Sequence, residues 1–188
     1  IMNSKDLRAI EHLGELWRAG VESFKIEGRT KSIYYLSLIT KTYRKAIDAM
    51  VKKEPFDSKL LGETEKTANR GFTTAFLLSA SERATENFDS PQEENLPQVY
   101  AGKVVNERAG GWMEVDIKNR VEVGHEIEYI SPQNNYRFRI SSMEGESGLS
   151  LKVAHGGNGT VWIKTDGQID PYALLSRVVD VPVSSSVS

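Results

Sequence analysis

Hydrophobic positions near the start of the chain recur first at helical and then at alternating spacing. Residues 7–17 place their apolar side chains three or four positions apart, which predicts a helix, and Gly20 is a stop signal. Residues 21–27 then alternate, with Phe24 and Ile26 on one face and polar side chains on the other. This alternation predicts a short strand.

Helical spacing returns after this strand. It runs from residue 33 to residue 50 and must end before Pro55, because proline cannot continue a helix. A shorter helix is predicted over residues 58–68. Residues 4–53 therefore predict helix, strand and helix in succession, the local pattern of an α/β protein. The predicted buried stripe of the long helix comprises Ile33, Leu36, Thr40, Tyr43, Ile47 and Met50.

Composition and period both change in the middle of the chain. Residues 87–97 are polar and end in a proline, which is typical of a linker. Beyond them the spacing alternates, and turn signals rich in glycine and asparagine separate six short candidate strands. These strands are 98–105, 112–117, 126–130, 136–141, 149–153 and 160–164.

Six short strands at this spacing favour a small closed antiparallel β-barrel, because closure removes the exposed edges of the sheet. Asp170 and Pro171 form a cap and a first position for a last short helix through Ser176. The predicted fold class is therefore α+β, with helix–strand–helix units followed by a six-stranded barrel. The predicted divisions are a first domain over 1–86, a linker over 87–97, the barrel over 98–179 and a disordered tail over 180–188.

The bulk composition limits the class of protein. The 188 residues are 39% hydrophobic and 27% charged, as in soluble globular proteins. No apolar run approaches the roughly 20 residues of a membrane-spanning helix, and no leader is evident, so we expect a cytoplasmic protein without a membrane partner. The formal net charge of −2 means that any binding of nucleic acid must come from a local patch. Ile1 precedes Met2, which suggests a fragment of a longer protein.

Cysteine is absent from the sequence, which excludes disulfides and thiolate-held iron–sulfur clusters within this chain. The three histidines lie far apart and lack the spacing of metal ligands. No metal or cofactor site is therefore predicted from these residue types.

The alternating stretch before the long helix is unusually charged. Lys25 and Glu27 share its polar face, and Arg29 follows at its carboxyl end. In a parallel barrel, that face points into the lumen and that end is where active sites lie. These three residues are therefore candidates for a catalytic site. A buried structural ion pair between Lys25 and Glu27, or with other partners in the lumen, explains the same pattern, and both interpretations stay open.

Basic residues also gather on the long helix and at its start. Lys41, Arg44 and Lys45 form either a solvated helix face or a patch that contacts phosphate. Lys31 and Arg29 stand at the positive end of the helix dipole, where an anionic visitor would be favoured. With Arg70, which begins a turn, the basic residues Lys31, Lys41, Arg44 and Lys45 are the candidates for contact with nucleic acid.

Several stretches resemble one known family. Residues 3–7 (Asn-Ser-Lys-Asp-Leu), 25–32 (Lys-Ile-Glu-Gly-Arg-Thr-Lys-Ser) and 43–48 (Tyr-Arg-Lys-Ala-Ile-Asp) are similar to the collagenase-like peptidase family U32. Residues 70–73, with Phe76, also resemble that family. The likeness is greatest to its bacterial tRNA hydroxylation branch, which acts in making 5-hydroxyuridine at the wobble position.

The resemblance implies a longer protein whose amino-terminal part is a (β/α) barrel. This chain would hold the last units of that barrel and the small β-barrel, and the missing barrel portion would be its partner. The resemblance also implies tRNA as substrate, prephenate as co-substrate and an iron–sulfur cluster held by upstream cysteines. Lys25, Glu27 and Arg29 match the family's motif and would line the mouth of the active site.

Three functions stay open at this point. The first is the carboxyl-terminal part of a tRNA-uridine hydroxylation enzyme, with an RNA-facing small barrel. The second is a collagenase-like protease, which the family's name suggests, and the third is a non-catalytic module that binds RNA or protein. We expect the isolated chain to be catalytically inactive and able to associate with a second copy, because units taken from a barrel expose apolar faces.

Overall fold

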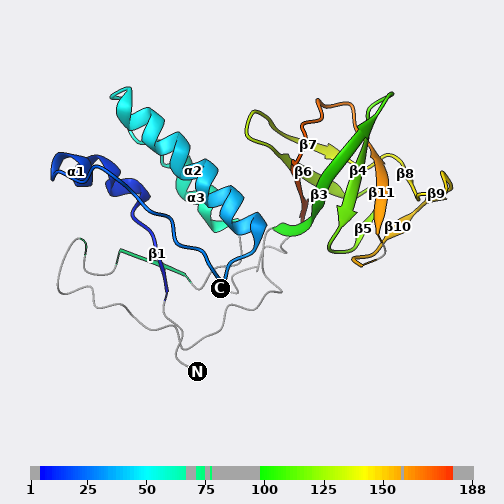
Figure 1. Cartoon of the computed structure of the whole chain (residues 1–188), viewed down its shortest axis with the longest axis horizontal. Helices are drawn as coiled ribbons and strands as arrows, with labels where there is room; N and C mark the ends of the chain where they lie inside the picture. The colour runs from blue at the N-terminus through cyan, green and yellow to red at the C-terminus, as the bar shows by residue number, and fades with distance from the viewer. Residues whose placement is uncertain (1–4, 67–70, 75–76, 78–97, 158, 180–188) are drawn as a thin grey trace, which may run out of the picture. The chain divides into compact units, whose positions relative to one another are not determined.

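The structure is a computed structural model that describes residues 5–66, 71–74, 77, 98–157 and 159–179. Contacts between Cα atoms divide the chain into two compact units, residues 1–96 and residues 97–188 (Figure 1). The predicted linker over 87–97 and the predicted tail over 180–188 lie outside the described residues. Each unit is described below by itself.

The first unit contains helices and one pair of very short parallel strands. Strand β1 pairs with β2, with Asp6 opposite Phe72 and Leu7 opposite Thr73. A small core forms where the helices meet, and it contains Ile10, Leu13, Ala46 and Leu60. The elements in chain order are β1 (Asp6–Leu7), η1 (Ile10–His12), α1 (Leu13–Arg18), α2 (Ile33–Val51), α3 (Lys59–Glu65) and β2 (Phe72–Thr73).

Helix α2 has the predicted bounds, and its predicted buried stripe is correct in part. Tyr43, Ile47 and Met50 pack against the small core, whereas Ile33 and Thr40 are exposed. The N-cap of α2 is Ser32, whose hydroxyl accepts a hydrogen bond from the backbone N–H of Tyr35 at 3.1 Å. Ile33 is 54% exposed, whereas Tyr34 is buried. The spacing gives the buried face only approximately, and packing against the neighbouring helices decides which residues at its margin are buried. The buried residues of α2 are Tyr34, Tyr35, Leu38, Ile39, Thr42 and Ala46.

The predicted strand over residues 21–27 is not formed. These residues have no regular secondary structure, although Phe24 still packs against the small core. A strand needs a neighbour to satisfy its backbone hydrogen bonds. Among the described residues of this unit, β1 and β2 pair with each other and neither pairs with residues 21–27. The alternating pattern of residues 21–27 therefore predicted a strand that, among the described residues, has no neighbouring strand to pair with.

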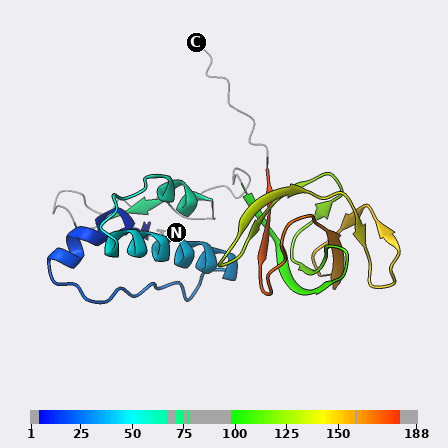
Figure 2. The ribbon, with the colours of Figure 1, turned by 90° about the horizontal axis from the view of Figure 1, so that it is seen from above.

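The second unit is a large antiparallel sheet. Its eight strands have the order β7-β6-β12-β3-β4-β11-β8-β9, and β5 pairs separately with β10. Figure 2 shows the sheet curling about its own concave side. The strands are β3 (Gln98–Arg108), β4 (Trp112–Ile117), β5 (Val121–Glu122), β6 (Glu126–Ile130), β7 (Asn135–Arg139), β8 (Met143–Glu144), β9 (Ser150–Leu151), β10 (Val153–Ala154), β11 (Thr160–Lys164) and β12 (Leu174–Val178).

One apolar cluster fills the concave side of this sheet. It takes buried residues from strands across the whole sheet, including Val104, Val115, Ile127, Ile163 and Leu175. Along β4 and β11, buried and half-buried residues alternate. The remaining side chains of these two strands therefore lie on the outer face of the sheet.

The predicted last helix is wrong. Residues 174–178 form β12, which lies between β6 and β3 in the interior of the sheet. Asp170 accepts a backbone hydrogen bond from Ala173, and Tyr172 has a φ of 66°, so the chain turns here instead of starting a helix. Leu174 and Leu175 are both buried, because a strand paired on both sides of a curled sheet has little access to water. The predicted strand 149–153 is likewise divided between β9 and β10.

Candidate functional site

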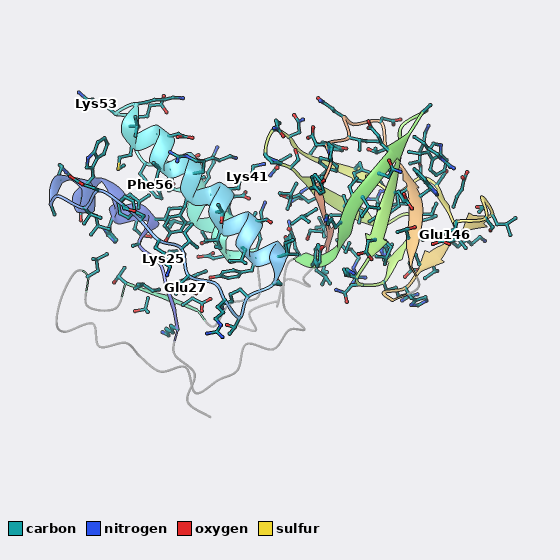
Figure 3. All side chains as sticks on the ribbon, viewed as in Figure 1. Lys25, Glu27, Lys41, Lys53, Phe56 and Glu146 are labelled. Atoms are coloured by element: carbon teal, nitrogen blue, oxygen red, sulfur yellow. The ribbon has the colours of Figure 1, made fainter. Side chains whose placement is uncertain are left out.

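The charged stretch before α2 is an exposed loop. Lys25 and Glu27 form an ion pair with 3.4 Å between Nζ and Oε2, and their side chains are 85% and 68% exposed. Figure 3 labels both on the segment that leads to α2. Arg29 is also exposed, in the turn that follows. The predicted direction of Lys25 and Glu27, into a barrel lumen, is not seen, because these residues belong to no strand.

The alternating pattern left open whether Lys25 and Glu27 pair with each other, and the structure shows that they do. An ion pair at this exposure contributes little to stability, of the order of 0–1 kcal/mol. Stability alone therefore gives a weak reason for these charges. The catalytic role of Lys25, Glu27 and Arg29 stays a prediction.

A partly buried cluster fixes the end of this loop. The Lys31 ammonium lies 2.8 and 2.6 Å from the two carboxylate oxygens of Asp6. The Tyr35 hydroxyl donates a hydrogen bond to Asp6 Oδ2 at 3.2 Å, and Lys31 Nζ lies 4.7 Å from the centroid of the Tyr35 ring. Burial, and then the Asp6 carboxylate, raise the pKa of the Tyr35 hydroxyl, so it stays protonated and can donate. The cluster ties β1 to the first turn of α2.

Gly28 allows the loop to approach α2 closely. A Cβ atom at this position would lie 2.2 Å from Leu36 Cδ2. The Gly28 carbonyl accepts a hydrogen bond from the Lys31 N–H at 2.9 Å, which closes the turn that carries Arg29. Lys31 was predicted to contact nucleic acid, and in this structure its ammonium binds Asp6.

Three of the remaining predicted basic residues, Lys41, Arg44 and Lys45, lie on α2. Arg44 pairs with Asp48 at 2.6 Å with both side chains more than half exposed, and Lys45 is exposed beside it. Lys41 is half-buried on α2 and is labelled in Figure 3. Arg70 lies outside the described residues. Arg44 and Lys45 thus point to solvent, where phosphate contact is sterically open, and that role stays a prediction.

Beside the carboxyl end of α2 is an open apolar depression of about 530 Å³. Trp17 from α1 and Phe56 beyond α2 are 48% and 37% exposed there, and Figure 3 labels Phe56 with Lys53.

Among the described residues, no group of three His, Cys, Asp or Glu side chains is placed to hold a metal ion. No helix in the described part of the chain is long and apolar enough to cross a membrane.

A cluster on the outer face of the second unit was missed by sequence reasoning. It comprises Arg108, Trp112, Trp162 and Lys164, and we call it the tryptophan patch. The Arg108 guanidinium carbon lies 4.8 Å from the Trp112 ring centroid and 4.5 Å from that of Trp162. Lys164 Nζ lies 5.6 Å from the Trp112 centroid. The signal was available: both tryptophans occupy the outward positions of correctly predicted alternating strands.

Comparison with family sequence models assigns both parts of the chain to the same family. Residues 1–87 match the sequence model of Peptidase family U32, and residues 97–176 match that of the Peptidase family U32 C-terminal domain. The chain belongs to peptidase family U32.

Two bacterial relatives are similar along nearly all of the chain. The tRNA hydroxylation protein P of Escherichia coli (strain K12) is 40% identical over 178 residues, which is 94% of this chain and 39% of that protein. The tRNA hydroxylation protein P1 of Bacillus subtilis (strain 168) is 30% identical over 181 residues, covering 94% and 43% respectively. The chain thus spans about two fifths of the length of these relatives.

Among solved structures, the chain is similar to the C-terminal domain of a Geobacillus thermoleovorans U32 peptidase. It is 24% identical, with a TM-score of 0.40, over 43% of this chain and 92% of that domain.

Proposed function

We propose that this chain is the carboxyl-terminal part of a tRNA-uridine 5-hydroxylation enzyme. The observation that carries the proposal is the 40% identity to a tRNA hydroxylation protein over 94% of the chain, which includes both units. Residue-level similarity across two units and the connection between them favours a shared function more strongly than a shared fold does. On this proposal, tRNA is the macromolecular substrate and the rest of the parent enzyme is the partner of this chain. Its place of action would be the cytoplasm.

In this proposal the first unit supplies the end of a (β/α) barrel and one wall of the active site. The parallel pairing of β1 with β2 is compatible with such a barrel. The loop with Lys25, Glu27 and Arg29 would then border the mouth of the site. Lys25 or Arg29 would bind a carboxylate or a phosphate, and Glu27 would orient one of these cations or act as an acid or base.

The second unit would complete the predicted small β-barrel. The support is that one apolar cluster takes residues from strands at both halves of the sheet order. Closure would bring the β7 side of the sheet to its β8–β9 side and remove both edges. This barrel would face the RNA as an accessory surface.

Two further components belong to the proposal as properties of the parent protein. Prephenate would be the co-substrate, and its carboxylates would suit the cations of the charged loop. An iron–sulfur cluster does not fit the residues of this chain, because the sequence has no cysteine and the described residues hold no metal-binding group. Any such cluster would be held elsewhere in the parent enzyme.

The experiment is mass spectrometry of tRNA nucleosides from a strain that lacks the parent gene. Loss of 5-hydroxyuridine derivatives, restored by the full-length protein, is the expected result. Full-length Lys25→Ala, Glu27→Ala and Arg29→Ala variants should each restore less of the modification than the unmodified protein does. A deletion strain with unchanged tRNA would contradict the function, and full restoration by all three variants would contradict the site.

Proteolysis receives no support from the residues of this chain. The sequence lacks the cysteine of a thiol protease, and the part of the chain that the structure describes lacks a metal-binding cluster. Unchanged tRNA in the deletion strain would instead favour the third function, a module that binds RNA without catalysis.

A further inference from the structure

The two tryptophans of the patch are half-buried and lie outside the apolar core cluster of the second unit. Met113 and Ile163, their immediate neighbours along β4 and β11, are fully buried in the core, so Trp112 and Trp162 face the opposite side of the sheet. Large aromatic side chains usually go to the interior, and a pair of them on an outer sheet face is a common sign of a binding surface. Register brings them together, because Trp112 pairs with Lys164, two residues from Trp162 on the neighbouring strand.

Arg108 joins the two indoles into one surface. It lies opposite Trp112 in the register of β3 and β4, and its guanidinium stacks on both rings. Its side chain is 38% exposed, so part of the group remains open to solvent. Indole rings and guanidinium planes are the groups on which proteins stack unpaired nucleic-acid bases.

The surroundings of the patch favour contact with bases over contact with a phosphate backbone. Glu144 forms an ion pair with Arg108, and Glu114 accepts a hydrogen bond from Thr160 at 2.7 Å, so the acids offset the cations. A duplex binder needs a row of uncompensated cations, whereas stacking on aromatic rings needs few. Next to Arg108 is a shallow depression of about 440 Å³, and its lining includes Gly110, Gly111 and Gly167 together with the acidic Glu107.

We infer that the tryptophan patch is a stacking site for unpaired bases of RNA. The inference rests on the proposed function for its ligand class, because an enzyme that modifies a tRNA base must hold a single-stranded loop. It assigns the contact to the outer face of β3, β4 and β11, and to stacking by Trp112, Trp162 and Arg108. Lys164 supplies a cation for a neighbouring phosphate.

The test uses the full chain with Trp17→Phe, which leaves Trp112 and Trp162 as the two remaining indoles. An unstructured uridine-rich RNA dodecamer should quench their fluorescence and bind, and a blunt RNA duplex of the same length should bind more weakly. Trp112→Leu or Trp162→Leu should weaken binding by about five- to a hundred-fold, the range for loss of one stacked base. Trp112→Phe and Trp162→Phe, which keep an aromatic ring, should retain most of the affinity.

Two matched controls separate stacking from general effects. Tyr172→Leu removes an aromatic side chain that is 74% exposed and lies 5.0 Å from Lys103 Nζ, outside the patch, and it should leave binding unchanged. Glu144→Gln should tighten binding by freeing Arg108. Glu146→Gln makes the same charge change near Thr160 without touching Arg108, and should tighten binding less (Figure 3). Thermal unfolding of each variant checks that the fold is intact.

Equal binding of the single strand and the duplex, or unchanged affinity in both leucine variants, would overturn the inference. So would quenching by an acidic peptide in the absence of any binding to RNA, which would make the patch a protein-binding surface. The outcome is independent of the tRNA analysis. RNA binding through the patch, together with tRNA in the deletion strain that keeps the same modifications as in the parent strain, would leave the site standing and remove the proposed function.

Discussion

Lys31 and Asp6 form a bidentate ion pair across 25 residues of sequence, with 2.6 and 2.8 Å from the ammonium nitrogen to the two carboxylate oxygens. The two side chains are 23% and 15% exposed. Pairs shielded to this degree are screened less by water than exposed pairs, and removal of one partner leaves the other partly desolvated. The pair therefore fixes β1 against the start of α2.

Replacement of Lys31 should destabilise the first unit. Lys31→Met leaves the Asp6 carboxylate without its cation, and we expect a loss of about 1–3 kcal/mol in the free energy of unfolding. Arg44→Met removes a cation from the exposed pair with Asp48 on the same helix and should cost about 0.5 kcal/mol or less. Urea unfolding followed by helical circular dichroism measures both. Equal losses would contradict a special role for the Lys31 pair.

The side chain of Leu175 tests the position of β12. It is fully buried in the sheet core, so Leu175→Ala should lower the free energy of unfolding by about 2–5 kcal/mol. Leu149 is 70% exposed, and Leu149→Ala should change stability by less than about 0.5 kcal/mol. Hydrogen exchange gives an independent check, because the amides of Ser176 and Arg177 should be protected as in a strand paired on both sides. Fast exchange at both would contradict the assignment.

Gly111 is required for the turn between β3 and β4. Its φ is +73°, and a Cβ atom there would lie 2.4 Å from the carbonyl oxygen of Thr165. Gly111→Ala therefore combines backbone strain with a clash against main chain, and we expect a loss of at least about 2 kcal/mol. Gly124 has a φ of +95° with open space around it, so Gly124→Ala should cost about 1 kcal/mol. Thermal melts of the two variants should differ accordingly, and a milder effect at Gly111 would contradict the clash.

His125 should make the second unit less stable at mildly acidic pH. Burial lowers its pKa below the ordinary 6.5; Arg177 and Arg120 lower the pKa further, and Glu122 raises it. Its Nδ1 accepts a hydrogen bond from the backbone N–H of Glu122 at 3.1 Å, which requires that this nitrogen be unprotonated.

The sign of the effect follows from proton binding. Between the lowered pKa and 6.5 the unfolded chain holds a proton that the folded chain does not, so stability falls as the pH falls through this window. His125→Gln should remove that part of the slope in the free energy of unfolding. Urea unfolding at a series of pH values provides the measurement. The same slope in His125→Gln as in the unmodified chain would contradict the assignment.

Local sequence patterns correctly predicted strands that pair with other strands of this chain. The bounds of β4, β6 and β11 were predicted from alternation and are confirmed, as is the start of α2 after Ser32. In the three strands, positions on the two faces alternate in the sequence, and in β4 and β11 the inward positions are consistently apolar, so the inward face is determined. The tryptophan patch could have been predicted from the same alternation, because the outward position of each tryptophan was already implied.

The failures have a shared physical cause. Residues 21–27 alternate like a strand, but a strand forms only where another strand completes its hydrogen bonds. Asp170 and Pro171 are compatible with both a helix start and a turn. The residues after them form a strand because they pair with β3 on one side and β6 on the other.

The sequence by itself determined the two-part α+β organisation, the main helix, most strands and the family resemblance, because these depend on local spacing and residue identity. Tertiary structure alone decided that Tyr34 and not Ile33 is buried on α2, that Lys25 pairs with Glu27 in solvent, and that Lys31 binds Asp6. It also brought Arg108 onto the rings of Trp112 and Trp162. Each of these depends on contacts between distant positions, whose geometry is fixed only when the whole unit packs.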